Sequence, residues 1–254
     1  MRLGATLPLP TQHSTRSTGD FITTTARRIE AAGYDSLWSF DAVGRGETWP
    51  DPLTLVAVAA AVTEHIELGI GVMQLPLRQT VDLAVRIMTS HSVCGDRLLL
   101  GVGCGSTAVD FQVMGGDYRT RQKTLQQQMS VLRKLVVEGR DDSVDLSPWP
   151  LQSAPPKWLL GTWDKHVEQA ANEFDGWIAS AHYRSDAELT EALPRYRAAG
   201  GQRAIATNIV LETPEAISDV AQRLENLAAA GFDDGVVCFS AGTEHLLDQV
   251  RSLV

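Results

Sequence analysis

The stretch DPLTLVAVAAAVTEHIELGIGV, residues 51–72, contains one helix and one strand of the pattern that decides the fold. Asp51 supplies a capping side chain in front of Pro52, which suits the first position of a helix, and an alanine-, leucine- and valine-rich helix is expected to run to Thr63. The short, continuous apolar run Ile66–Val72 is typical of a parallel strand that helices cover. The segment therefore predicts one helix–strand unit of an α/β protein.

Similar units repeat along the rest of the chain, where short apolar runs alternate with longer amphipathic stretches. The predicted strands are Arg2–Leu7, Ser36–Phe40, Ile66–Val72, Leu98–Val102, Lys157–Leu160, Gly176–Ser180, Ala204–Val210 and Gly235–Phe239. Helices are expected at Thr23–Ala32, Pro52–Thr63, Val81–Ser92, Tyr118–Glu138, Lys165–Glu173, Asp186–Ala199, Pro214–Ala230 and Glu244–Ser252. Eight strands, each followed by a helix, predict an α/β protein with one domain over residues 1–254, a (β/α)8 TIM barrel.

A doubly wound open sheet is the alternative fold. It would have about five or six strands and a glycine-rich turn after the first strand. Here the first turn is LPLPTQHS, residues 7–14, which contains no glycine. The barrel is therefore favoured, and its functional residues are expected where the strands run out into the helices.

Composition narrows the possible partners. With 31 Asp and Glu against 22 Lys and Arg among 254 residues, the net charge is −9, which argues against a nucleic acid or a membrane as partner. The three cysteines form no CxxC pair and are expected to be reduced thiols. The N-terminus has no apolar signal core, and the longest apolar run, Leu53–Val62, is shorter than the ~20 residues of a membrane span. We expect a cytoplasmic protein.

Several familiar active-site patterns are missing from the sequence. The six histidines show no HxH, HxxxH or HExxH spacing, so no metal site is expected. The sequence also lacks the GxSxG pattern of α/β-hydrolases and the Walker A pattern. A hydrolase or an aldolase on the barrel is accordingly the least favoured class.

Four places near predicted strand ends carry candidate site residues. The glycines of GVGCGST, residues 101–107, either let the backbone approach a ligand or only shape a tight strand exit. LGTWDK, residues 160–165, ends a strand and opens a helix, so Thr162 and Lys165 suit a phosphate site, although plain helix capping explains the segment equally well. Asp41 follows the second strand and His182 follows the sixth, which makes both candidates for catalytic groups.

Four stretches together resemble the luciferase-like monooxygenase family, whose members use reduced FMN or the deazaflavin F420. They are AAGYDSLWSFD (31–41), the stretch 51–78 that ends in LPLR, GDRLLLGVGCGST (95–107) and PPKWLLGTWDKHVEQAANEFDGWI (155–178). The resemblance covers about residues 1–180 well and the last third more loosely. It implies an FMN- or F420-dependent oxidoreductase or monooxygenase that acts on a small organic molecule.

The resemblance also implies roles for individual residues. Gly71 and Val72 match a bulge with a cis, non-proline peptide bond that supports the cofactor ring. The positions that match the remaining cofactor contacts are Gly103, Gly105 and Ser106 after the fourth strand, Gly161, Thr162 and Lys165 after the fifth, and Ser180 with residues 182–184 after the sixth. A separate reductase or dehydrogenase would supply the reduced cofactor. A homodimer is expected, with the apolar helix Leu53–Val62 near its interface.

The sequence departs from the family pattern at the end of the second strand. Many relatives have a catalytic histidine directly after the acidic residue, whereas Ala42 follows Asp41 here. Ser106 stands where some F420-dependent sugar-phosphate dehydrogenases have a glutamate, and Leu160 replaces the first glycine of a common Gly-Gly-Ser turn. Sugar-phosphate dehydrogenation is therefore disfavoured. The alternative to an enzyme is a barrel that binds the cofactor but has lost turnover.

Overall fold

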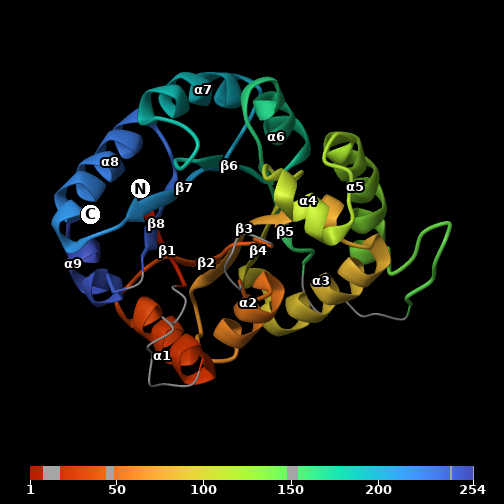
Figure 1. Cartoon of the computed structure of the whole chain (residues 1–254), viewed down its shortest axis with the longest axis horizontal. Coiled ribbons are helices and arrows are strands. Elements are labelled where there is room, and N and C mark those ends of the chain that lie inside the picture. Colours follow the sequence, from red (N-terminus) through yellow and green to blue (C-terminus); the bar gives the residue numbers. More distant parts are fainter. Residues whose placement is uncertain (8–17, 44–48, 148–153, 241, 254) are drawn as a thin grey trace.

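The computed structural model describes residues 1–7, 18–43, 49–147, 154–240 and 242–253. In this part of the chain, eight parallel strands close into a barrel in sequence order, β1 next to β2 and so on to β8, which pairs with β1 (Figure 1). The strands are β1 Arg2–Thr6, β2 Ser36–Ser39, β3 Glu67–Gln74, β4 Leu98–Gly103, β5 Lys157–Gly161, β6 Gly176–Ser180, β7 Ala204–Leu211 and β8 Asp234–Phe239. The predicted (β/α)8 barrel is confirmed, and the open sheet is excluded.

Helices surround the barrel (Figure 1). They are α1 Thr18–Ala31, α2 Pro52–Ala60, α3 Thr80–Cys94, α4 Ala108–Met114, α5 Arg121–Glu138, α6 Val167–Glu173, α7 Asp186–Ala198, α8 Ile217–Ala230 and α9 Leu247–Ser252. The expected cap of α2 is present, because the Asp51 carboxylate accepts a hydrogen bond of 2.9 Å from the Thr54 backbone N–H.

Two helix predictions were wrong in ways that matter for the site. The short helix α4 was not predicted, and it ends at Gly115, whose φ of 71° is left-handed. The helix predicted to begin at Lys165 begins instead at Val167. A 3-10 turn, Asp164–His166, precedes it, and Asp164 has a left-handed φ of 52° that no α-helix accommodates.

Two apolar layers hold the barrel together. Alternate strand residues point inward and form a small central core of Trp38, Leu99, Leu159, Ile178, Ile205 and Val236, while the others pack against the helices. Trp38 fits there because its neighbour on β3 is a glycine: a Cβ on Gly69 would lie 2.4 Å from the indole. The core fills the barrel, so a ligand site has to lie at one end of it.

Ion pairs close the end of the barrel at which the strands begin. Arg203 lies between Asp234 and Glu67, with nitrogen–oxygen distances of 2.7 Å to each carboxylate, and Arg2 also contacts Glu67 at 2.7 Å. Burial alone would raise the pKa of Glu67, but the hydrogen bonds and charges of Arg203 and Arg2 outweigh it and lower that pKa. This end of the barrel is therefore stabilised by a charge network, and the candidate site residues lie at the other end.

Among the described residues, none of the helices has the length and apolar character needed to cross a bilayer.

Candidate active site

The C-terminal end of β3 carries an irregularity that organises the site. The peptide bond between Gly71 and Val72 is cis, as the family resemblance implied, and the pairing of β3 with β4 shifts between Ile70 and Met73. The half-buried Val72 side chain packs on the central core. A Cβ on Gly103 or on Gly161 would lie only 2.7 or 2.5 Å from Val72, so the glycines of β4 and β5 leave room for this side chain.

Asp41 lies at the end of β2 in a buried ion pair. Its two carboxylate oxygens each lie 2.7 Å from a different nitrogen of Arg78, and one of them also accepts a hydrogen bond of 2.8 Å from the Gln74 backbone N–H. The Gln74 side-chain amide donates hydrogen bonds to the Asp41 carbonyl oxygen and to the carboxylate of the buried Asp110 of α4. Asp41 therefore ties β2 to the end of β3, and sequence reasoning missed Arg78 and Gln74 as its partners.

The loop after β4 reaches the loop after β6. The Ser106 hydroxyl lies 3.3 Å from the Tyr183 hydroxyl, and the Tyr118 hydroxyl donates to the Ser106 carbonyl oxygen. Arg121 stacks on Tyr118 and donates to the carbonyl oxygen of Gly105, whose φ is 80°. The predicted residues Gly105 and Ser106 therefore lie at the C-terminal end of the barrel, in a loop whose conformation is fixed by hydrogen bonds from Tyr118 and Arg121.

His182, the other predicted catalytic residue, is exposed, and its ring packs edge-to-face against Tyr183 with 4.8 Å between centroids. Asp41 faces Arg78 instead. The described contacts therefore do not bring the two predicted catalytic side chains together, and their catalytic roles stay predictions.

The turn after β5 differs from a simple helix N-terminus. Thr162 lies two residues before the 3-10 turn, and its carbonyl oxygen accepts a hydrogen bond of 3.0 Å from the Trp177 indole. Trp163 lies under the guanidinium of Arg184, 4.8 Å from the ring centroid. The side chain of Lys165 lies outside the described residues. Arg184 thus places a positive charge beside the Thr162 turn. From the sequence it was predicted only as a member of the loop after β6.

A further polar group lies on β7, beside the last residue of β6. The Asn208 amide donates a hydrogen bond of 3.2 Å to the hydroxyl of Ser180, a predicted cofactor residue. Asn208 was not predicted from the sequence. Its one visible signal is an asparagine inside an otherwise apolar strand, a type that β-strands disfavour.

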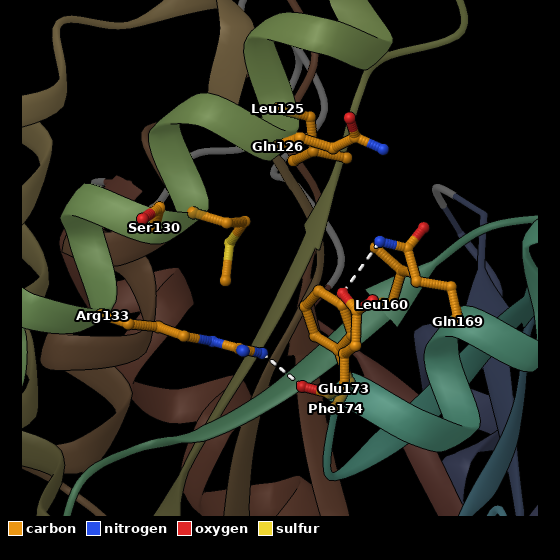
Figure 2. A pocket seen from close by; sticks show the side chains of 9 residues that line it. Leu125, Gln126, Ser130, Arg133, Leu160, Gln169, Glu173 and Phe174 are labelled. Carbon is orange, nitrogen blue, oxygen red and sulfur yellow. Dashed lines mark hydrogen bonds between the residues drawn. The ribbon is translucent and has the colours of Figure 1, made fainter.

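No cluster of three or more possible metal ligands occurs within the described ranges. A hollow of about 400 Å³ lies outside the barrel, between α5 and α6. Figure 2 shows Arg133 of α5 reaching across it to the Glu173 carbonyl oxygen of α6 and lying near Phe174. None of the predicted site residues lines this hollow, although Leu160, the neighbour of Gly161 on β5, does.

Residues 1–247 match the luciferase-like monooxygenase family, and the chain belongs to that family. Among curated relatives, 4-hydroxyprotoasukamycin monooxygenase of Streptomyces nodosus subsp. asukaensis is 29% identical over 126 residues, which is 49% of this chain and 33% of that protein. The match thus spans a third of that relative's length.

Solved structures share the fold at low sequence identity. An F420-dependent secondary alcohol dehydrogenase in complex with an F420-acetone adduct has a TM-score of 0.81 at 14% identity, covering 100% of this chain and 98% of that one. The oxygenating constituent of 3,6-diketocamphane monooxygenase from Pseudomonas putida, in complex with FMN, has a TM-score of 0.73 at 16% identity, covering 100% and 95%. These likenesses place the chain on the fold of both FMN and F420 proteins.

Proposed function

We propose that this protein is an oxidoreductase that uses FMN or F420 to transform a small organic substrate. The observation that carries the proposal is the arrangement at the C-terminal end of β3, where Val72 lies over the central core between Gly103 and Gly161. Together with the polar side chains around it, this apolar surface suits a flat ring with a polar edge. Family membership supports the same class, and it favours an enzyme over a barrel that has lost turnover.

The cofactor, when bound, would supply the hydride or oxygen chemistry. Val72 would support one face of its ring, while Gly103, Gly105 and Ser106 line the neighbouring loop. Because Asp41 ties β2 to the end of β3 through Arg78 and Gln74, we assign it first a positioning role. A separate reductase or dehydrogenase would deliver the reduced cofactor.

The cofactor's phosphate is assigned to the turn after β5. Thr162 offers a hydroxyl, Lys165 and Arg184 offer positive charge, and Arg184 is already oriented by its stacking on Trp163. Charge-assisted hydrogen bonds to phosphate are stronger than neutral ones. Ser180 lies at the end of the adjacent strand β6 and is expected to lie nearer the cofactor ring than the phosphate.

The experiment that tests the proposed function is identification of the bound cofactor. The chain would be produced in a host that makes both FMN and F420, purified, denatured, and its released small molecules analysed by mass spectrometry. Recovery of one of the two in proportion to protein supports the proposal. Protein that carries neither, and takes up neither when it is supplied in excess, would refute it.

Substituting Thr162 with valine is expected to weaken cofactor binding by roughly 10- to 150-fold, because a hydrogen bond to a charged group contributes about 1.5–3 kcal/mol. Valine keeps the shape, and the Thr162 carbonyl oxygen can still accept the Trp177 bond. The melting temperature of the apoprotein should therefore stay the same. Titration of FMN or F420 measures the affinity, with Thr124→Val on α5 as the control. Unchanged affinity for Thr162→Val would assign the phosphate to Ser180 and the 182–184 loop.

We also propose a homodimer that forms through the outer face of α2 and α3. The inner face of α2 is buried within the chain, while its Ala61 end and the α3 side chains Val81, Val85 and Val93 are exposed. Val85→Glu should convert a dimer to a monomer in light scattering at micromolar concentration, because a charge is costly in an apolar interface. Val137→Glu, at an exposed valine of α5, should leave the dimer intact. A wild-type monomer would contradict this proposal.

A further inference from the structure

β7 contains a bulge near its middle, at the level of Ser180, the last residue of β6. The pairing of β7 with β8 shifts between Ala206 and Ile209, and Asn208 within this shift has a left-handed φ of 61°. Thr207 lies two residues after Ile205 of the central core, so its side chain shares the inward face of the strand. By the same alternation, Ser180 shares the inward face of β6 with Ile178.

Two polar atoms at this bulge are buried without a hydrogen-bond partner among the described residues. They are the Thr207 hydroxyl, in a side chain that is fully buried, and the Asn208 carboxamide oxygen. Buried polar atoms are nearly always paired in folded proteins, and leaving one unpaired destabilises the fold. The two atoms belong to adjacent residues at the end of the barrel where this fold places its ligands. This indicates that a bound ligand supplies their hydrogen-bond partners.

The donor and acceptor properties of the two groups determine which ligand groups can pair with them. The carboxamide oxygen of asparagine accepts a hydrogen bond, and the threonine hydroxyl can donate one. Together they suit a ligand edge in which an N–H lies next to a C=O, as in an amide or a cyclic imide. The ring systems of FMN and F420 both carry this imide edge, so either cofactor could pair with the two groups.

We propose that Thr207 and Asn208 bind the imide edge of the cofactor ring, an inference that rests on the proposed cofactor function. The Asn208 carboxamide oxygen accepts from the ring N–H, and the Thr207 hydroxyl donates to the neighbouring carbonyl oxygen. Ser180 orients the Asn208 amide through the 3.2 Å bond. Both unpartnered atoms are covered from water, so we expect the half-buried Asn208 side chain to shift together with the Ser180 hydroxyl that it contacts when the cofactor binds.

The test measures binding of FMN, F420 and N3-methylated FMN to the apoprotein and two variants. Thr207→Val removes only the hydroxyl, and Asn208→Gly removes the amide while tolerating the left-handed backbone. Each variant should lose about 3- to 10-fold in affinity for the cofactor that the wild type binds, the effect of one ordinary hydrogen bond. If that cofactor is FMN, N3-methylation should weaken binding to the wild type by a similar factor and to Asn208→Gly not at all; if it is F420, the methylated deazaflavin takes its place.

Apoprotein stability separates a ligand contact from a structural role. Thr207→Val replaces an unpaired buried hydroxyl with a methyl group, so the melting temperature should stay level or rise while affinity falls. Ser39→Ala is the matched control, because Ser39 on β2 is also buried and unpartnered but lies beside Trp38 and faces away from the axis. It should leave affinity unchanged.

Wild-type affinity in both β7 variants would overturn the inference while leaving the proposed function intact. A loss of affinity that N3-methylation does not reproduce would also overturn it, because the contact would then not be to the imide N–H. Failure of the wild type to bind FMN or F420 would overturn both the inference and the proposed function.

Discussion

Replacing Arg78 with methionine is expected to lower the free energy of unfolding by about 3–5 kcal/mol, because Asp41 would remain buried without its positive partner. In the ion pair the Arg78 side chain is 10% exposed and that of Asp41 is 2% exposed. Both carboxylate oxygens would lose a bond of 2.7 Å. Urea denaturation measures the effect, and removing both charges in Asp41→Leu/Arg78→Met should be less damaging than the two single losses added together.

Arg78→Met and a second variant, Asp41→Asn, separate the two roles of Asp41. If Asp41 positions the end of β3 through Gln74, Arg78→Met should also weaken cofactor binding, since it releases the carboxylate that holds the Gln74 N–H. If Asp41 instead transfers a proton, Asp41→Asn should abolish turnover and its pH dependence while the cofactor affinity stays at the wild-type level. A measurement of affinity, turnover rate and pH profile on both variants distinguishes these outcomes.

Arg203→Met, at the opposite end of the barrel, is also expected to lower the free energy of unfolding by about 3–5 kcal/mol. Asp234 is fully buried and would lose its bidentate partner. Cofactor affinity should stay at the wild-type value, since this network lies at the far end of the strands. The control is Arg28→Met, which breaks an ion pair to the exposed Asp248 and should cost at most about 1 kcal/mol. A loss for Arg203→Met no larger than for Arg28→Met would contradict the assigned role.

The pH dependence of this network follows from Glu67. Its pKa in the folded protein lies below the ordinary value of 4.5, so its ion pairs stabilise the fold above that pH and the contribution disappears as the pH falls through the lowered value. Arg203→Met removes the main positive partner of Glu67. The stability difference between wild type and variant should accordingly narrow below about pH 4.5, which denaturation at a series of pH values measures.

The eight strands could be predicted because each is a short apolar run between amphipathic stretches, and the observed boundaries agree with the predicted ones within two residues. The helix α4 could not be predicted, since it has only seven residues, too few to show a helical repeat, and glycines lie close to both of its ends. The start of α6 was predicted two residues too early. The residue types of the Thr162–Lys165 turn do not indicate that Asp164 adopts a left-handed conformation, which delays the helix to Val167.

Site residues close in sequence were easier to predict than those joined by the fold. Gly71, Gly103, Gly161 and Ser180 each follow from a strand end and a family motif. The partners of Asp41 do not, because Arg78 lies 37 residues away and meets it only when β2 and β3 pair. Asn208 was missed for another reason: a bulge at residue 208 breaks the alternation that would otherwise fix the direction of its side chain.

Equilibrium titration of the apoprotein with FMN and with F420, followed by cofactor fluorescence, tests the central claim most directly. The account predicts saturable binding of at least one of them at one molecule per chain. Riboflavin, which has the FMN ring system without the phosphate, should bind more weakly than FMN if FMN is the ligand, because it makes no contact with the Thr162 turn. Titrations in which neither FMN nor F420 binds the correctly folded protein would contradict the account.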